Sequence, residues 1–278
     1  WIIKYFKEIN AGIDALLTED TEKIKFSKEM LPFELKLNAV KHTLNKQKVE
    51  VAYAEQRKDE LVMYLAHDIR TPLTSVLGYL ELLEPEMSIE QRLGYVHIAL
   101  DKANRLGKMI NEFFEITRYN SGQVTLSKVY IDLYYMLVQL LDELSPLFSI
   151  RGNSVTLNID ENITIYADAD KIARVFSNIL RNAAAYSYPK TEIVISAEVK
   201  ENQITLFFCN QGKTISADDL DKLFDKFYRS DKSRRADTGG TGLGLAIAKE
   251  IVLLHNGEIY AESQNDTITF CVRLPMSD

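Results

Sequence analysis

The sequence lacks any run of about 20 consecutive apolar residues, so no segment of its 278 residues is predicted to cross a membrane. Cysteine is nearly absent: the two that occur, Cys209 and Cys271, are far apart and lie in apolar, strand-like runs. This argues against a disulfide framework and predicts buried, reduced thiols in a cytosolic setting. Acidic residues outnumber basic ones, 40 against 33, and the formal net charge of −7 argues against broad binding to a nucleic-acid backbone.

What remains is an ordinary globular composition, with 46% hydrophobic and 26% charged residues. The length suffices for a full core and predicts two or more domains. The first six residues, from Trp1 to Phe6, are aromatic, apolar and basic, and two interpretations of them stay open. Either they leave a bilayer, with a membrane part upstream of this sequence, or they simply begin an amphipathic helix.

Helical spacing dominates the first 66 residues. It predicts a short amphipathic helix over residues 1–17, followed by a polar break at residues 18–25. From Leu37 to Leu65, side chains three and four apart form a narrow apolar seam with charged residues elsewhere, which is typical of a coiled coil. The simplest partner for such a seam is a second copy of the chain. The polar residues Gln47 and Lys58 weaken the seam. Either this suits a helix that transmits signals better than a rigid strut, or the two polar residues occur there by chance.

His67 lies in the continuation of this helical run, beside Asp68 and four residues before Thr71. At about 100° per residue, His67 is turned by roughly 200° from the apolar stripe that includes Leu65, and Thr71 shares its outward face. Pro72 lacks an amide proton and is expected to bend the helix here. An outward histidine is either an idle surface residue or a group that several partners must reach.

A second helical stretch covers residues 89–119 and is joined to the first by a short loop around Pro85. Its apolar stripe includes Leu93, Leu100 and Phe114. Two long helices with a short connection predict an antiparallel hairpin. One hairpin cannot cover the apolar stripes of both helices. We therefore predict a homodimer through residues 59–119, in which two hairpins form an all-α four-helix bundle.

Beyond Gly122 the pattern changes to alternating helices and strands. Helical spacing predicts helices at residues 131–150, 168–186, 217–227 and 243–255. Alternating or apolar runs predict strands at residues 155–159, 163–166, 192–199, 203–210, 258–263 and 267–274, the last two joined by a turn at Asn265 and Asp266. Because helices and antiparallel strands are intermingled, this half is predicted to be an α+β sandwich and not a parallel dinucleotide-binding sheet.

Residues 238–249 contain the strongest glycine-rich motif, with Gly240, Gly242 and Gly244 close before a helical stretch. Glycines let backbone amides approach phosphate oxygens, and the positive end of the following helix favours an anion. No Gly-Lys-Ser/Thr closes the loop, so it is not a Walker motif, and no strand leads into it, so it is not a dinucleotide fingerprint. Alone, the motif fits a phosphate loop or a flexible linker equally well.

Three further motifs favour a nucleotide site. Asn178 and Asn182 are four apart on one helix face, where two amides either meet a hydrated Mg²⁺ and phosphate oxygens or are plain surface residues. Asn210 ends a buried strand two residues before Gly212, and it either reads an adenine edge or belongs to a turn. The third motif is an aromatic cluster that either walls a nucleotide pocket or anchors the charged loop after it: Phe224, Phe227 and Tyr228.

With these motifs assembled, the chain resembles the cytoplasmic part of bacterial membrane sensor histidine kinases. Five short motifs occur in the order of that family, which is far more specific than any one of them alone. They are the phospho-acceptor box at residues 67–72, the N box at 178–186, the first glycine box at 210–212, the F box at 224–229 and the second glycine box at 240–244. In finer detail, the amino-acid sequence is similar to that of the vancomycin-resistance (VanS-type) sensor kinases at residues 63–67, 113–120, 132–138 and 181–187.

The resemblance implies a multidomain architecture. It assigns residues 1–58 to a HAMP-like relay with a connecting coiled-coil helix, and residues 59–122 to a dimerisation and phosphotransfer hairpin. Residues 128–278 would form a catalytic ATP-binding domain of the GHKL (Bergerat) type. The resemblance also implies attachment to the cell membrane through an upstream segment, with this portion on the cytoplasmic side.

The implied activity is ATP-dependent phosphorylation of His67, followed by phosphotransfer to an aspartate of a VanR-type response regulator and by phosphatase action on that regulator. His67 would attack the γ-phosphorus, and Asp68 would fix the tautomer of its ring. Thr71 would hold the water for the reverse reaction, and Arg70 completes the implied catalytic set.

The implied cofactors are ATP and Mg²⁺, with the metal at Asn178 and Asn182. The resemblance carries the nucleotide-binding role onto a larger set of residues. These are Asn178, Asn182, Tyr186, Asn210, Gly212, Ile215, Phe227, Tyr228, Arg229, Gly240, Thr241, Gly242, Leu243, Gly244 and Leu245.

Three positions depart from the family pattern. Asn210 stands where Asp is usual, Thr214 where a second glycine is common, and Ala185 where a basic residue often follows the N box. These departures put the affinity for ATP in question more than the activity. Two rival functions stay open: an ATP-hydrolysing machine of the same superfamily and a non-catalytic coiled-coil scaffold. The former carries a water-activating Glu where this chain has Asn178, and the intact motifs argue against the latter.

Overall fold

The computed structural model describes residues 2–17, 23–84, 86–120, 124–228 and 241–277. The predicted polar break, the break after Asn120 and the charged loop at 229–240 fall partly or wholly outside these ranges. Contacts divide the chain into two units, Trp1–Ala66 and His67–Asp278. No helix within the described ranges is long and apolar enough to span a bilayer.

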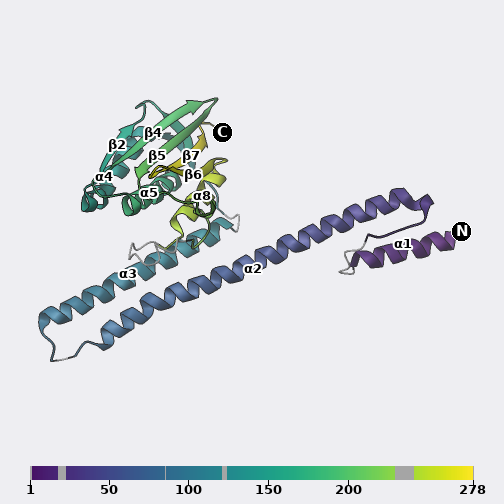
Figure 1. Cartoon of the computed structure of the whole chain (residues 1–278), viewed down its shortest axis with the longest axis horizontal. Coiled ribbons are helices and arrows are strands. Elements are labelled where there is room, and N and C mark those ends of the chain that lie inside the picture. The colour runs from purple at the N-terminus through teal and green to yellow at the C-terminus, as the bar shows by residue number, and fades with distance from the viewer. Residues whose placement is uncertain (1, 18–22, 85, 121–123, 229–240, 278) are drawn as a thin grey trace. The chain divides into compact units, whose positions relative to one another are not determined.

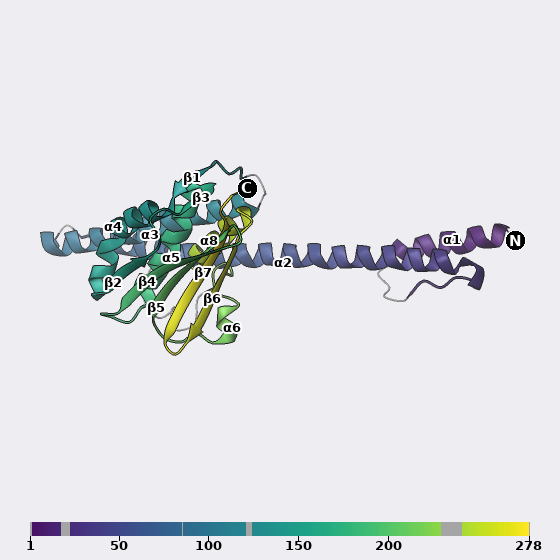
Figure 2. The same cartoon turned by 90° about the horizontal axis from the view of Figure 1, so that it is seen from above.

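The first unit consists of a helix, a connector of which residues 23–27 are described, and the first part of a second, long helix. Helix α1 (Ile2–Leu17) lies beside the first part of the long helix α2 (Leu31–Glu81), which follows the 3₁₀ turn η1 (Lys28–Met30) (Figures 1 and 2). The Asn38 amide holds the connector, since it accepts from Ile24 N at 3.0 Å and donates to Ile24 O at 2.9 Å. A Cβ on Gly12 would lie 2.3 Å from Cζ of Phe26, so only glycine lets the connector pack this closely on α1.

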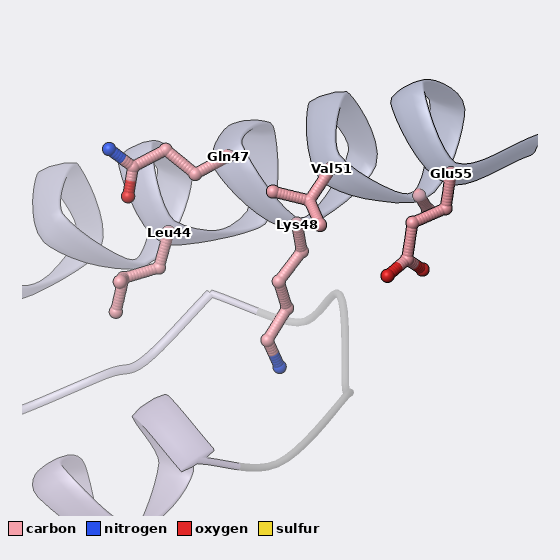
Figure 3. A pocket seen from close by; sticks show the side chains of 6 residues that line it. Leu44, Gln47, Lys48, Val51 and Glu55 are labelled. Atoms are coloured by element: carbon pink, nitrogen blue, oxygen red, sulfur yellow. The ribbon is translucent and has the colours of Figure 1, made fainter. Parts of the chain in front are cut away.

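The predicted coiled-coil seam lies on α2, and much of it is uncovered. Val51, for example, is 59% exposed, although Leu37 near the start is buried. Figure 3 shows the shallow groove that this surface forms. It is lined from α2 alone by Leu44, Gln47, Lys48, Val51, Ala52 and Glu55. That a second copy of the chain completes the seam stays a prediction.

The second unit begins with the helical hairpin. α2 continues through Pro72 to Glu81, so the proline does not end the helix, and α3 (Ile89–Asn120) follows after a short loop. Across the hairpin, the ring centroids of Tyr79 and Tyr95 lie 5.6 Å apart. Its two helices also expose a set of large apolar side chains, namely Leu73, Leu77, Leu80, Ile89, Leu93, Val96 and Leu100. These exposed side chains are what the predicted four-helix bundle would bury.

The rest of the second unit is an α+β sandwich. A mixed sheet has the strand order β2-β4-β5-β7-β6, in which only the β2–β4 pair is parallel. The strands are β2 (Ser154–Asn158), β4 (Glu192–Lys200), β5 (Gln203–Gln211), β6 (Glu258–Gln264) and β7 (Thr267–Pro275). Helices α4 (Leu133–Arg151), α5 (Ala169–Tyr186) and α8 (Gly244–Leu254) cover one face of the sheet (Figure 1). The core lies between these layers, where the buried rings of Phe176 and Phe208 pack at a tilt with their centroids 5.5 Å apart.

Two element predictions need correction. The helix expected at 131–150 begins at Leu133, because Asp132 is extended and caps it, accepting from Tyr135 N at 2.8 Å. The residues before it form β1 (Lys128–Asp132), which pairs with β3 (Thr164–Asp168). The helix expected at 217–227 is only α6 (Ala217–Leu220), because tighter turns follow and Phe227 has a positive φ of 62°. The turn at Asn265 and Asp266 is confirmed, with φ of 51° and 56°.

A buried histidine connects the end of α8 to the start of α5. The amide of Asp168 donates to Nε2 of His255 at 3.0 Å, so this nitrogen is unprotonated, and Nδ1 donates to Ile251 O at 2.8 Å. The Asp168 carboxylate caps α5 and also accepts from Ser127 N at 2.9 Å. Burial holds the pKa of His255 below its usual value. The folded domain therefore needs this ring neutral.

We expect the domain to lose stability on mild acidification through His255. Below about pH 6.5 the unfolded chain binds a proton at His255, whereas the folded ring does not. The contribution of the neutral ring to the free energy of unfolding is therefore fully present above that pH. It falls as the pH drops further, by at most about 1.4 kcal/mol per unit until the folded pKa is reached. His255→Gln keeps an acceptor for the Asp168 amide but cannot titrate. Between about pH 7.5 and about pH 5.5, urea unfolding should show a larger drop in the free energy of unfolding for the wild type than for His255→Gln. Equal drops in the two proteins would contradict this role.

Candidate functional site

The end of the glycine-rich motif and Asn178 meet in space, although 66 residues separate Asn178 from Gly244. The Asn178 side chain donates from Nδ2 to Gly244 O at 2.9 Å, at the first residue of α8. Leu243, directly before it, is fully buried, and its amide donates to the Thr241 hydroxyl at 3.2 Å. The hydrogen bond fixes the amide orientation of Asn178 and leaves its Oδ1 as the atom available to a ligand. Asn182 lies one turn further along α5 and is half-buried.

Gly242 ties the loop to the aromatic cluster. Its carbonyl accepts from Phe227 N at 3.0 Å, and its φ of 74° lies in the left-handed region. A Cβ at this position would lie 3.0 Å from Phe227 Cα and 3.2 Å from Tyr228 O. Both the conformation and the space therefore require glycine. Tyr228 is held in turn by a hydrogen bond from its hydroxyl to Asp219.

Asn210 is a buried polar group at the end of an apolar row. Ile204, Leu206 and Phe208 precede it on the face of β5 that packs against the helices, and Asn210 itself is 1% exposed. Neither Nδ2 nor Oδ1 has a hydrogen-bond partner among the described residues. Such an unsatisfied pair costs about 1–3 kcal/mol per group, so a ligand that both donates and accepts is strongly favoured here. An adenine base meets this requirement, so these residues fit ATP.

Gly212 and the end of α5 close this part of the site. A Cβ on Gly212 would lie 2.9 Å from Tyr186 O and 3.4 Å from Asn210 Nδ2, so glycine allows the close approach of the two elements. Tyr186 is the last residue of α5 and is partly exposed. Ile215 and Leu245 are half-buried, and Ile215 N donates to Ser263 Oγ at 3.0 Å.

The departures and the remaining candidates can also be placed. The Thr214 hydroxyl accepts from Asp266 N at 2.9 Å and so joins the β6–β7 turn, and Ala185 is half-buried on α5. Arg229 and Gly240 lie outside the described residues.

The phospho-acceptor box lies within the continuous helix α2. The backbone of His67 is helical, and its side chain is outside the described part of the structure. Asp68 is half-buried, whereas Arg70 and Thr71 are exposed. Because the helix is unbroken, positions 67 and 71 share one face of it.

A contact between α3 and the glycine-rich loop is not predicted by any sequence pattern above. Glu112 of α3 is only 3% exposed and accepts a hydrogen bond from the Thr241 hydroxyl. Arg174 of α5 lies 3.9 Å from Glu112 and 3.0 Å from Glu115, measured from Nη2 to carboxylate oxygens. Burial and the neighbouring Glu115 raise the pKa of Tyr119.

The packing around this contact explains why the stripe analysis missed it. The stripe predicted on α3 includes Phe114, which is 61% exposed. The C-terminal part of α3 instead buries Met109, Ile116 and Tyr119. This second apolar line, seven and three residues apart, is the signal that could have indicated a second packing partner for α3.

Comparison with known proteins agrees with this arrangement. Residues 57–122 match the family model of the His Kinase A (phospho-acceptor) domain. Residues 167–278 match that of the histidine kinase-, DNA gyrase B- and HSP90-like ATPases, which supports the use of ATP. Among solved structures, histidine kinase ThkA in complex with response regulator protein TrrA is similar, with a TM-score of 0.64 at 21% identity over 84% of this chain and 67% of that one. That likeness shows a shared fold.

Curated relatives give the narrower family. Sensor protein VanS of Enterococcus faecium is 53% identical over 274 residues, which cover 98% of this chain and 71% of the relative. Sensor protein VanSC of Enterococcus gallinarum is 44% identical over 275 residues, covering 98% and 76%. The chain therefore belongs to the VanS-type sensor histidine kinases, two-component protein-histidine kinases of vancomycin-resistance signalling. The fold class and the enzyme class predicted from the sequence are confirmed.

We expect the two glycines of the loop to respond differently to alanine. Gly242→Ala should lower the free energy of unfolding of the ATP-binding domain by about 1–2 kcal/mol or more, because its positive φ and the Phe227 backbone oppose a side chain. Gly244→Ala is the matched control, because its Cβ would lie 3.4 Å from Asn178 Oδ1 at an ordinary helical position. That variant should stay within about 0.5 kcal/mol of the wild type. Urea unfolding measures both, and equal losses would refute the distinction.

Proposed function

We propose that His67 is the phospho-acceptor of this kinase and that the α+β domain delivers the γ-phosphate of ATP to it. The observation that carries the proposal is the convergence in one domain of Asn178, the glycine-rich loop and the unsatisfied Asn210 amide. His67 itself lies in the segment that matches the phospho-acceptor family. The outward face expected for it suits a group that must be reached by two partners in turn.

The proposed division of work within the nucleotide site follows from its contacts. Asn210 meets the base, and the amides of Gly242 and Gly244 with the N-terminus of α8 meet the phosphates. Asn178 Oδ1 and Asn182 hold Mg²⁺, which neutralises phosphate charge when it is bound. Asp68 accepts from the Nδ1–H of His67, so that Nε2 carries the lone pair that attacks phosphorus.

The proposed partner is a response regulator of the VanR type, whose aspartate receives the phosphoryl group from His67. The similar kinase ThkA is found in complex with a response regulator, which supports this class of partner. Thr71, exposed on the same helix face as position 67, would orient the water that hydrolyses the regulator phosphate. The same chain then acts as kinase and phosphatase.

We further propose that the kinase is a homodimer through residues 59–119 and works at the cytoplasmic face of the cell membrane. The exposed apolar residues of the hairpin support the dimer, because a second hairpin would bury them. The membrane location rests on the family alone, through a segment outside the present sequence. Residues 1–58 would then form the HAMP-like relay between that segment and the kinase.

Labelling with ATP that carries ³²P at the γ-position tests the kinase proposal. The wild type should acquire acid-labile, alkali-stable label, and His67→Gln should lose it completely. His97→Gln is the matched control, because His97 is an exposed histidine on α3 of the same hairpin, and it should label normally. Free phosphate without protein label would identify an ATPase instead, and neither product would identify a scaffold.

Replacement of Thr71 tests the phosphatase proposal. Thr71→Ala should label within about twofold of the wild type but remove phosphate from the regulator at least about tenfold more slowly, since only the water-orienting hydroxyl is lost. Thr74→Ala, one turn further along the same helix and also exposed, should change neither rate. Loss of labelling in Thr71→Ala would show that the hydroxyl serves the forward reaction instead.

A further inference from the structure

The amide of Asn210 is buried, and no side chain or backbone group in the described part of the domain orients it. Both of its polar atoms lack a partner among the described residues. Two other buried or partly buried amides of the domain differ in this respect. Asn178 is oriented by its bond to Gly244 O, and Asn153 by bonds from Nδ2 to Tyr188 O at 2.7 Å and Thr191 O at 3.0 Å. Asn210 can therefore turn its amide by 180° without losing a hydrogen bond to the described protein.

This freedom matters because of what a purine presents at its six-position edge. Adenine has a donor at its 6-amino group and an acceptor at N1. A 6-oxopurine such as hypoxanthine or guanine has the reverse, an acceptor at O6 and a donor at N1. An amide matches either edge with two hydrogen bonds, depending on its orientation, whereas an ionised carboxylate can only accept. A carboxylate at this position would repel O6, so it selects adenine, and an amide does not.

The residues that pair with Asn210 across the sheet do not favour either orientation of its amide. Asn210 continues the apolar row of β5, and its neighbours across the sheet are Ile193 and Ile268. Neither isoleucine side chain can hydrogen-bond, so neither favours one orientation of the amide. The base edge itself is then the group that decides the orientation.

We propose that Asn210 makes this kinase accept nucleoside triphosphates with a 6-oxopurine base as well as ATP, so that residue 210 sets base selectivity. The inference rests on the proposed nucleotide site, in which the base lies at Asn210. It predicts a weaker preference for adenine than in kinases with Asp at this position.

Inosine triphosphate is the sharpest probe, because it differs from ATP only at this edge. Binding of ATP and inosine triphosphate with Mg²⁺ is measured by calorimetry on the whole chain at about pH 8, where an introduced carboxyl is ionised. The wild type should bind the two nucleotides within about tenfold of each other. Asn210→Asp should keep ATP binding but raise the ratio of dissociation constants above about 100, since a hydrogen bond is replaced by repulsion.

Two further variants control for charge and for folding. Asn182→Asp places the same new charge near the phosphates and should change both affinities without changing their ratio. Asn210→Leu removes both hydrogen bonds, so it should weaken both nucleotides alike, and it decides the question if the Asp variant does not fold. A wild-type ratio above about 100, or an unchanged ratio in Asn210→Asp, overturns the inference.

Labelling of His67 by the two γ-labelled nucleotides separates this inference from the kinase proposal. Label from ATP with strong rejection of inosine triphosphate leaves the kinase intact and overturns the base tolerance. Binding ratios as predicted without any label leave the base tolerance intact and overturn the role of His67. If neither nucleotide binds, both the base tolerance and the kinase proposal are overturned.

Discussion

The hydrogen bond from Asn178 to the carbonyl of Gly244 is the contact on which the nucleotide site depends. It joins α5, which is anchored in the core by Phe176, to the first residue of α8. Residues 241–243, directly before α8, are thereby held on one side by Asn178 and on the other by the backbone of Phe227, through Gly242. A loop rich in glycine is flexible by composition. For the described residues 241–243 the cost of ordering is met in the folded protein before any ligand arrives, which favours binding.

Much of the fold could be predicted because the signals are local. The strands β6 and β7 alternate, and the turn between them needs two residues with positive φ, which Asn265 and Asp266 tolerate. The segment at 221–227 could not be predicted, because its apolar residues keep a helical spacing. The structure instead ends the helix so that Phe227 N can reach Gly242 O, a partner 15 residues away that no local pattern specifies.

The candidate site shows the same division. Glycines and asparagines with special backbone or amide roles are visible in a sequence, because few other residues can replace them. Glu112 and Arg174 look like ordinary surface charges until α3 packs against α5 and α8. The Asn210 amide lies between these cases, since the residue type was noted from the sequence but only the structure reveals that no described residue orients it.

The Thr241 hydroxyl has a single proton to donate, and in this structure it is given to Glu112 of the hairpin. A nucleotide phosphate that took this proton would compete directly with a buried carboxylate of α3. By linkage, nucleotide binding and the packing of α3 on Thr241 then oppose each other. The free energy by which the docked α3 weakens nucleotide binding equals the free energy by which the bound nucleotide weakens the docking of α3. A change in the helices that loosened α3 would thus be felt as a change in nucleotide affinity, without any movement of the sheet.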